Sequence, residues 1–377
     1  MSDWEDLALG EFLSFSNGKK RPDATGLIPV FGGNGIYASA NSANAEKDTI
    51  VIGRVGAYCG SIFFSNSPCW VSDNAISCRA NVGVSAIWAH YMLKVYDLGH
   101  YATGAAQPML TQSILKSLSV KVPSEPEQEA IAEVLSSLDD KIDLLKRQNK
   151  TLEGMAEALF RQWFIEEARD DWPVLELRDV FEEIESGRRP KGGVGKYTEG
   201  VPSIGAESVK KIGVHEFGKE KFVPQEFFDS MKKGVVQHHD ILVYKDGGVP
   251  GEFKPHFTMV GFGFPHAKMC INEHVFRCRP KRPTLRSFSF CYLNSRRCRF
   301  ELEERGTGAA IPGLNSTEFS TCPIPLPNEE LLEKFESLAG DWFDRILKNA
   351  LESRALEKLR DTLLPKLMSG EVRVQMD

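Results

Sequence analysis

The sequence lacks the patterns that a membrane span, an export signal or a disulfide framework requires. No apolar run in the 377 residues approaches the ~20 residues of a membrane-spanning helix. The acidic start at 1–6 has neither the basic residues nor the apolar core of a secretory signal. The eight cysteines include no CxxC pair, which argues against a zinc knuckle or a thioredoxin motif. Scattered thiols fit a reducing compartment, so we expect a cytoplasmic protein without contact to a membrane.

Motifs for catalysis or cofactor binding are missing or incomplete. Gly33–Ala38 fits G-x-G-x-x-A, but Ser39–Ser42 is a poor start for the helix that a dinucleotide site needs. Gly193–Thr198 lacks parts of a phosphate loop, and the pair His238 and His239 has no carboxylate or cysteine at ligand spacing. There is no HExxH, no G-x-S-x-G and no Asn/Asp-Pro-Pro-Tyr/Phe block of adenine methyltransferases. We therefore expect no catalytic residue, no metal site and no cofactor in this chain.

The net charge of −6 is unevenly distributed along the chain. Residues 1–123 have a net charge of zero and residues 171–326 carry +3, whereas 124–170 carry −6 and 327–377 carry −3. The acidity therefore lies in two short segments. The two long segments are neutral or basic, so nucleic-acid binding remains open for them.

The sequence repeats itself, and the repeat is clearest towards the end of each half. At an offset of 204 residues, small-residue and proline positions of 100–123 fall on their counterparts in 304–327 without a gap. Because the matched blocks keep their order, we interpret the second half as a diverged copy of the first. The matches are Thr103–Ala106 with Thr307–Ala310, Pro108 with Pro312, Leu110 with Leu314, and Pro123 with Pro327.

The earlier parts of the two halves match more loosely, with a smaller offset. Asp3–Leu9 parallels Asp171–Leu177, and Asp48–Val51 parallels Asp240–Val243 at an offset of 192. The growing offset predicts that the second half carries insertions in its globular part. Short β-rich runs separated by Gly and Pro turns predict mixed α and β structure there.

Each half ends in a segment with the spacing of a coiled coil. Residues 126–165 begin with Pro126, which suits a first helical turn, and repeat apolar residues at heptad spacing over ~60 Å of helix. The C-terminal segment repeats the pattern with polar Asn349 and Ser353 in its middle, and Pro365 should bend or end that helix. We expect the two helices to pair antiparallel, although packing on their own domains is the alternative. The predicted pairing residues are Ile131, Leu135, Leu138, Ile142, Leu145, Leu152, Leu159, Phe335, Leu338, Trp342, Ile346, Leu356, Leu359 and Leu363.

Basic and aromatic residues cluster in glycine-rich loops of both globular parts. One basic loop follows Gly18 in the first copy and another follows Gly187 in the second, and Lys245 takes the place that Arg54 has in the repeat. Flexible basic loops suit phosphate contacts, and polar side chains there can reach base edges. A further basic run extends from 277 to 299, although each cluster alone could be a solvated face. The candidate DNA-binding residues are Lys19, Lys20, Arg21, Asn34, Tyr37, Arg54, Tyr58, Arg188, Arg189, Lys191, Lys196 and Lys245.

Several blocks resemble the specificity subunits of type I restriction-modification enzymes, and together they cover essentially the whole chain. They are Leu159–Phe164, Leu363–Val374, Ile324–Pro327, Ile28–Gly35 and the opening Trp172-Pro173-x-x-x-Leu177. The C-terminal block is the most specific. Two helix entries, at 124–128 and 327–330, depart from the usual pattern of that family without disturbing the heptads.

The resemblance implies a non-catalytic subunit that binds a bipartite, asymmetric double-stranded DNA sequence. Each recognition domain would read one half, and the helices would set the spacer and dock two methyltransferase subunits. Two restriction subunits could join, and S-adenosylmethionine, ATP and magnesium would belong to the partners.

We therefore expect an α+β fold with an internal pseudo-twofold repeat. Two mixed α/β recognition domains at 1–123 and 171–326 would alternate with helical spacers at 124–170 and 327–377. The competing interpretation is a protein-interaction scaffold with two diverged globular domains on a coiled coil. Sequence-specific, salt-dependent DNA binding separates the two interpretations.

Overall fold

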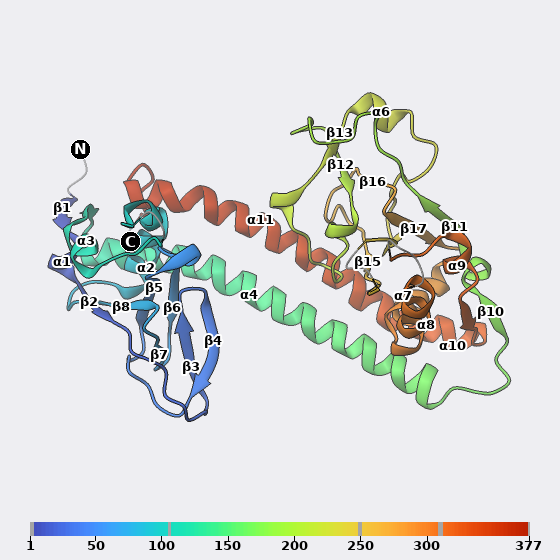
Figure 1. Cartoon of the computed structure of the whole chain (residues 1–377), viewed down its shortest axis with the longest axis horizontal. Helices are drawn as coiled ribbons and strands as arrows, with labels where there is room; N and C mark the ends of the chain where they lie inside the picture. The colour runs from blue at the N-terminus through green and yellow to red at the C-terminus, as the bar shows by residue number, and fades with distance from the viewer. Residues whose placement is uncertain (1–3, 105–106, 248–250, 308–311, 376–377) are drawn as a thin grey trace. The chain divides into compact units, whose positions relative to one another are not determined.

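The chain forms two compact units, shown in the computed structural model of Figure 1. The structure describes residues 4–104, 107–247, 251–307 and 312–375. Unit 1 comprises Met1–Lys141 and Leu356–Asp377, and unit 2 comprises Ile142–Ala355. The two helical segments that the sequence separates as spacers are thus each shared between the units. Most of the repeated Thr-Gly-Ala-Ala block lies outside the described residues.

Unit 1 is built on a four-stranded sheet with the order β2-β8-β5-β6 and a three-stranded sheet with the order β4-β3-β7. The run Thr49–Gly53 is β-branched and wholly buried, so it takes a central place as β5. Helix α2 packs against this sheet, and a small sheet of β1 and β9 closes the unit. The elements are β1 (Glu5–Ala8), α1 (Leu9–Phe12), β2 (Leu13–Asn17), β3 (Ile28–Gly32), β4 (Gly35–Ala40), β5 (Thr49–Gly53), β6 (Ile62–Ser65), β7 (Trp70–Val71), β8 (Ala75–Ala80), α2 (Ala86–Val95), α3 (Gln112–Ser117) and β9 (Ser119–Val122).

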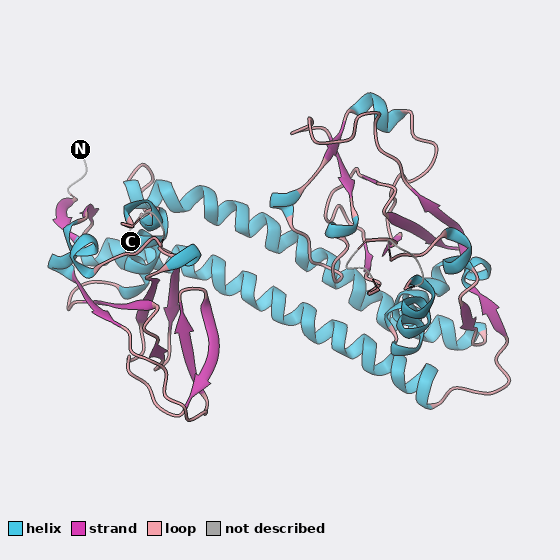
Figure 2. Ribbon diagram, in the orientation of Figure 1, coloured by secondary structure: helices cyan, strands magenta, loops and turns pink. Residues whose placement is uncertain are grey.

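Unit 2 repeats this topology sheet by sheet, with the orders β11-β17-β14-β15, β13-β12-β16 and β10-β18. Figure 2 shows the longer loops and extra helices of unit 2. The elements are β10 (Val174–Glu176), α5 (Leu177–Val180), β11 (Phe181–Ser186), β12 (Val201–Ile204), β13 (Phe222–Val223), α6 (Gln225–Asp229), β14 (Ile241–Tyr244), β15 (Phe257–Met259), β16 (Cys270–Ile271), β17 (Val275–Pro280), α7 (Arg286–Asn294), α8 (Arg296–Gly306), α9 (Ser316–Ser320) and β18 (Pro323–Pro325).

Equivalent backbone hydrogen bonds confirm that the second half copies the first. The amide of Gly56 donates to Pro108 in unit 1, and the amide of Gly247 donates to Pro312 in unit 2. A second hydrogen bond closes the same loop in each unit. The amide of Leu110 donates to the carbonyl of Arg54, and the amide of Leu314 donates to that of Lys245. Since these contacts join segments far apart in sequence, chance similarity of loops does not account for them.

The strand register corrects one part of the repeat by a single residue. In unit 1 Ile50 pairs with Cys78, and in unit 2 Ile241 pairs with Cys278. The offset at these strands is therefore 191, and the alignment of Asp48 with Asp240 at 192 was wrong. The structural counterpart of Asp48 is His239, and both have a positive φ, of 59° and 66°. The left-handed backbone at Asp48 and His239 shows that these two positions are equivalent. The sequence alignment missed this because it matched the aspartates at 48 and 240.

The long helices are α4 (Glu125–Arg161) and α11 (Asp341–Ser369), and each is preceded or followed by a π turn. In unit 1, Arg360 of α11 pairs with Asp139 of α4, and Arg373 pairs with Glu127 nearer the start of α4. In unit 2, Asn349 bonds Asn149, and the aromatic ring of Phe335 packs on Phe164. In both units higher numbers on one helix meet lower numbers on the other, so the antiparallel pairing is confirmed within each unit.

The predicted pairing residues are buried or half-buried, except Leu338 and Leu359, which are 43% and 47% exposed. The prediction for Leu338 fails because a π turn at Glu336–Gly340 adds a residue to the helix between α10 (Glu329–Phe335) and α11. The buried face then continues at Ala339 and Phe343 instead of Leu338 and Trp342. Buried positions are Ile131, Leu135, Ile142, Leu145, Phe335 and Ile346, and half-buried positions are Leu138, Leu152, Leu159, Trp342, Leu356 and Leu363.

The sequence predicted that Pro365 would bend or end the C-terminal helix. The helix does not end there. Helix α11 continues to Ser369, because Leu367 is buried in the core of unit 1 and holds the last turn there. Gly370, with φ of 73°, follows the last turn beside the ring of Trp4. None of the described helices is long and apolar enough to cross a membrane. The eight cysteines are free thiols.

Candidate nucleic-acid interface

In unit 1 several strands end at one turn, formed by residues 71–75. Asn17 at the end of β2 lies opposite Ile76, and Gly53 at the end of β5 lies opposite Ala75. The parallel strands β3 and β7 bring Phe31 beside Val71. Loops that leave β2, β3 and β5 therefore gather around the 71–75 turn.

The basic loop at 19–21 is anchored to this turn by its backbone. The amides of Gly18 and Lys19 donate to the carbonyls of Ala75 and Val71, both at 3.0 Å. A Cβ on Gly18 would come within 2.0 Å of the Ser72 carbonyl oxygen, so only glycine allows this approach. Lys19, Lys20 and Arg21 are exposed. Among the described residues no carboxylate forms an ion pair with them, so their charges are available to an outside anion.

The second loop is the two-residue hairpin turn of β3 and β4, with Asn34 at its tip. This turn excludes the dinucleotide alternative, because a strand and not a helix follows it. The turn lies against the 53–58 segment, with the Cβ position of Gly33 at 3.7 Å from Cβ of Tyr58. Tyr37 and Tyr58 are 58% and 51% exposed. The structure thus brings Asn34, Tyr37 and Tyr58 to the same edge.

Arg54 occupies the third loop, directly after β5. Its amide donates to the carbonyl of Asn74 at 2.9 Å, which fixes it beside the 71–75 turn. The guanidinium is half-buried, its Nε has no hydrogen-bond partner, and one terminal nitrogen is 3.9 Å from the sulfur of Met109. Among the described residues, no carboxylate pairs with Arg54. Its guanidinium is therefore suited to donate hydrogen bonds to an anion or an acceptor group from outside.

Unit 2 has the equivalent arrangement at its 271–275 turn. The amide of Gly187 donates to the carbonyl of Asn272, and the amide of Lys245 donates to that of His274, each at 3.1 Å. A Cβ on Gly187 would approach the Ile271 carbonyl oxygen within 1.8 Å, so this close approach again requires glycine. Lys245 and Arg54 therefore hold structurally equivalent places, as the sequence predicted.

The charged groups at the 271–275 turn form a paired cluster, unlike those of unit 1. Lys245 bonds Asp246 at 2.7 Å and the carbonyl of Glu273 at 3.2 Å, and Arg189 forms an ion pair with Glu273 at 2.5 Å. His274 bonds both Asp246 and Arg189. Burial raises the pKa of Asp246, but hydrogen bonds from Lys245 and His274 outweigh it and hold that pKa below its usual value. The cluster therefore places the carboxylates of Asp246 and Glu273 next to the cations Lys245 and Arg189.

The other candidates of unit 2 lie in the loop between β11 and β12 and are not all free. Arg188 donates to the carbonyl and the hydroxyl of Ser230, both at 2.9 Å, and stacks over the ring of Phe227. Lys191 and Lys196 are exposed, and Lys196 lies over the ring of Tyr197. Arg188 therefore orders the loop, while Lys191 and Lys196 present charge to solvent.

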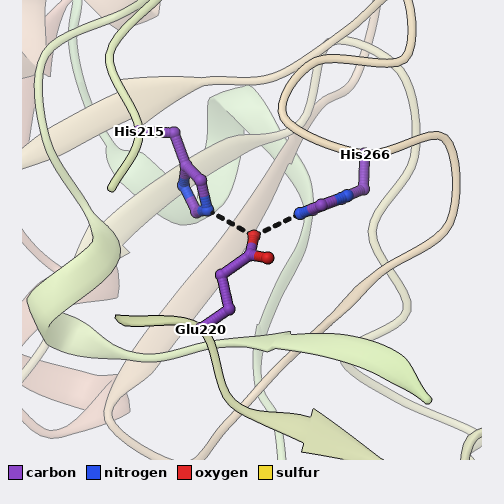
Figure 3. Close-up of side chains that lie close together, drawn as sticks. All are labelled: His215, Glu220 and His266. Atoms are coloured by element: carbon purple, nitrogen blue, oxygen red, sulfur yellow. Dashed lines mark hydrogen bonds and ion pairs between the residues drawn. The ribbon is translucent and has the colours of Figure 1, made fainter. Parts of the chain in front are cut away.

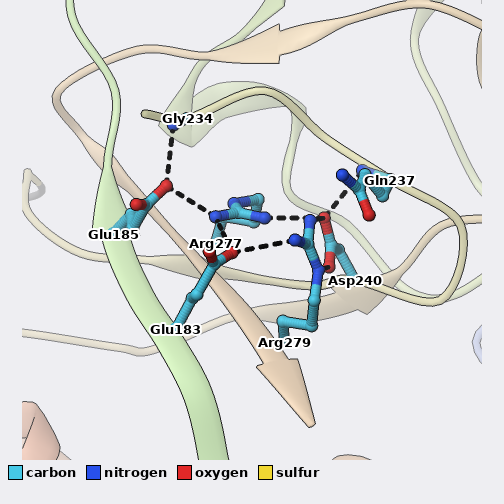
Figure 4. Close-up of polar contacts among 7 residues, drawn as sticks. All are labelled: Glu183, Glu185, Gly234, Gln237, Asp240, Arg277 and Arg279. Atoms are coloured by element: carbon cyan, nitrogen blue, oxygen red, sulfur yellow. Dashed lines mark hydrogen bonds and ion pairs between the residues drawn. The ribbon is translucent and has the colours of Figure 1, made fainter. Parts of the chain in front are cut away.

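The basic run at 277–299 is only partly internal: its buried or half-buried members are Arg277, Arg279, Arg286 and Arg299, and its exposed members are Lys281, Arg282, Arg296 and Arg297. Arg277 is 3% exposed and bonds Glu185 at 2.5 Å, Asp240 at 3.4 Å and also Glu183 (Figure 4). Arg279 holds the fully buried Asp240 through two bonds of 2.9 and 3.0 Å. The guanidinium groups of both arginines already pair with carboxylates of the same unit, so these two arginines are not phosphate contacts.

Sequence reasoning missed the polar residues of the two turns themselves. Asn74 and His274 lie at the same place in the repeat, next to Arg54 and Lys245, and Asp246 and Glu273 complete the cluster of unit 2. The repeat at Cys78 and Cys278 has the same offset of 200 and could have located Asn74 and His274. Their acceptor and donor groups, close to arginine and lysine, are the kinds that read base edges.

Comparison with known proteins gives one family. The family model of the type I restriction modification DNA specificity domain matches residues 1–154 and 169–353. The MjaIX type I restriction enzyme specificity subunit of Methanocaldococcus jannaschii is 26% identical over 354 residues, which is 87% of this chain and 78% of that protein. The MjaVIII specificity subunit of the same organism is 23% identical and covers 99% of this chain and 94% of its own.

A solved structure has the same fold along its whole length. The crystal structure of the S subunit of a type I restriction-modification system from M. genitalium superposes with a TM-score of 0.67 at 16% identity, over 100% of this chain and 97% of that chain. Three observations point to one duplicated domain: the repeated sheets, the antiparallel helices and the two matches to one domain model. The chain belongs to the type I restriction-modification DNA specificity family.

Proposed function

We propose that this chain is a non-catalytic specificity subunit that reads a bipartite, asymmetric DNA target. The observation that carries the proposal is the duplicated turn, at 71–75 and 271–275, which presents different side chains at equivalent places. Arg54 in unit 1 corresponds to Lys245 in unit 2, and Asn74 corresponds to His274. Equivalent frames with different polar groups suit two different half-sites, whereas identical groups would suit a palindrome.

The two recognition edges differ in charge as well as in residue type. The unit 1 edge offers the unpaired cations Lys19, Lys20 and Arg21, which suit backbone phosphates. The unit 2 edge offers Lys191 and Lys196 for phosphates, and the Asp246 and Glu273 carboxylates as hydrogen-bond acceptors. Carboxylates accept hydrogen bonds from the amino group of cytosine, so unit 2 has the groups for direct readout.

The helices supply the surface for partner subunits in this proposal. Leu144, Met155 and Leu351 are exposed apolar residues on α4 and α11 within unit 2. A cavity of about 870 Å³ lies between the end of α4 and helices α7 and α8, and exposed Ile165 and Phe300 line it. Exposed apolar surface of this kind marks protein contacts. Two methyltransferase subunits would dock on the helices and carry S-adenosylmethionine, and restriction subunits, where present, would bring ATP and magnesium.

The experiment is a DNA-retention assay with the full chain and its co-expressed methyltransferase. Wild-type complex should retain one two-part sequence over random competitor DNA, and retention should fall steeply between 50 and 200 mM salt. Phe300→Asp should reduce co-purification of the partner while leaving the fold intact. Retention without any sequence preference would contradict the recognition role, and unchanged partner binding in Phe300→Asp would contradict the docking surface.

A further inference from the structure

Three potential metal ligands meet in unit 2, away from the 271–275 turn. His215 precedes the short helical turn Phe217–Lys219, Glu220 follows it, and His266 comes from the loop after β15. One carboxylate oxygen of Glu220, Oε1, lies 2.8 Å from Nε2 of His215 and also bonds Nε2 of His266 (Figure 3). The three ligand atoms all lie within 4.8 Å of one another. Both imidazoles thus point their ε nitrogens at one carboxylate.

The cluster is shielded on most sides and has one opening. The side chains of His215 and Glu220 are 2% and 11% exposed, whereas that of His266 is 26% exposed. The ring of Phe217 packs edge-on against both imidazoles, with centroid distances of 4.7 and 5.7 Å. An ion could enter at the His266 side.

We propose that His215, Glu220 and His266 bind a zinc ion. Two imidazole nitrogens and one carboxylate oxygen form a set that binds Zn²⁺ with a fourth position left for water. Ligand atoms around tetrahedral zinc lie roughly 3.3 Å apart, given bonds of about 2.0–2.1 Å. The hydrogen-bonded spacing of His215 and Glu220 is 2.8 Å, so this side of the triangle needs to open by about half an ångström, and the shorter contact of Glu220 with His266 needs to open further. Zinc would replace the two imidazole–carboxylate hydrogen bonds, and each imidazole would bind through Nε2 as the neutral tautomer that carries its proton on Nδ1.

The ion would join two loops that attach the recognition domain to the helices within unit 2. In the first loop, Gly213 lies against Ile346, and the guanidinium of Arg354 stacks 3.8 Å from the ring of Phe217. In the second loop, Gly261 lies near Leu347, and Lys348 lies over the ring of Phe262. A bond between the loops would therefore hold the domain at a fixed angle on α11. Arg354 opposes the added charge, and the Glu220 carboxylate offsets it.

The site escaped sequence reasoning because its third ligand, His266, lies 46 residues beyond Glu220. The only histidine pair in the sequence, His238 and His239, has another use. His239 bonds Asp344 at 2.9 Å and Arg286, and His238 accepts the amide of Phe262. The prediction of no metal site rested on that pair and on the missing CxxC and HExxH motifs, and none of these patterns reports ligands that only the fold brings together.

The test uses the full chain after removal of metals with a chelator, titrated with Zn²⁺ in a calorimeter and with Co²⁺ by visible absorption. We expect one Zn²⁺ per chain, and intense visible absorption from a four-coordinate Co²⁺ centre. His266→Gln and Glu220→Gln should each weaken binding at least 100-fold. His100→Gln, which changes an exposed histidine in unit 1, is the matched control and should bind normally.

Thermal unfolding distinguishes a variant that has lost the metal site from one that fails to fold. Zn²⁺ should raise the Tm of the wild type and of His100→Gln, but not that of His266→Gln, whose metal-free Tm should equal that of the metal-free wild type. Absence of stoichiometric binding, or equal binding by His266→Gln, would show that the three residues are only a hydrogen-bonded triad. This result would leave the proposed DNA recognition untouched.

Discussion

Lys20 and Arg21 are exposed cations held beside the recognition edge of unit 1 by the bonded backbone of Gly18 and Lys19. If they contact phosphates, Lys20→Ala should weaken binding of all DNA sequences alike and lower the salt slope by about 0.9. Fluorescence-anisotropy titrations at several salt concentrations measure this. The matched control is Lys121→Ala, which changes an exposed lysine on β9 that pairs with Asp6 on β1. An equal loss of affinity in the control would mean that only net charge matters.

Glu185 contributes to stability in a pH-dependent way. Burial raises its pKa, but the amide of Gly234 and the guanidinium of Arg277 outweigh burial and lower it. A lowered carboxyl pKa stabilises the fold above the unfolded value of about 4.3 and loses that contribution as pH falls through the folded value. Glu185→Gln should therefore destabilise unit 2 by about 1–3 kcal/mol at pH 7. Denaturant unfolding should show the difference from wild type shrinking below about pH 4. A difference that is constant with pH would contradict this role.

At the level of residues, the sequence predicts where a functional loop lies better than what its side chains do. The places of Arg54 and Lys245 follow from the repeat, and the structure confirms that they are equivalent. The state of each side chain depends on distant partners, as Arg188 shows by bonding Ser230 directly after α6. Arg277 likewise looks like a surface cation in sequence and is 3% exposed in the fold.

The paired asparagines of α4 and α11 specify how these helices meet in unit 2. Asn349 is 1% exposed and donates to Asn149 at 2.9 Å, while Asn149 donates to the carbonyl of Ile346. Asn149→Leu alone should destabilise by about 1–3 kcal/mol, because it leaves a buried amide unpaired. Asn149→Leu with Asn349→Leu should be at least as stable as wild type but less specific in register. A double-mutant cycle in thermal unfolding measures the coupling, and strictly additive effects would contradict the pairing.

Element types followed from the sequence more closely than element registers did. Heptad spacing predicted both long helices, and the β-rich runs predicted the central strands β5 and β14. The π turn at Glu336–Gly340 was not predictable, because a single widened turn leaves no spacing signal until the apolar face is seen to shift. Similarly, the aspartates at 48 and 240 suggested an offset that the strand pairing corrects.

For the whole molecule, the proposal assigns the helices the task of setting the DNA spacer. One heptad inserted in α4 and one in α11 adds roughly 10 Å of helix, equivalent to at most about 3 base pairs. The spacer in the preferred DNA sequence should lengthen while both half-sites remain the same. Selection of bound sequences from a random DNA pool measures this. An unchanged spacer would contradict the ruler, whereas changed half-sites would indicate that the insertion disturbs the domains.

The most direct test of two-domain recognition is the methylated-adenine map of cells that carry the chain with its methyltransferase. Wild type is compared with Arg54→Ala and with Asp246→Asn, one change at each recognition edge. Two-domain recognition predicts one asymmetric two-part motif, in which Arg54→Ala relaxes or abolishes one half and Asp246→Asn affects the other half. A motif in which both variants alter the same half, or a map that does not depend on this chain, would contradict two-domain recognition.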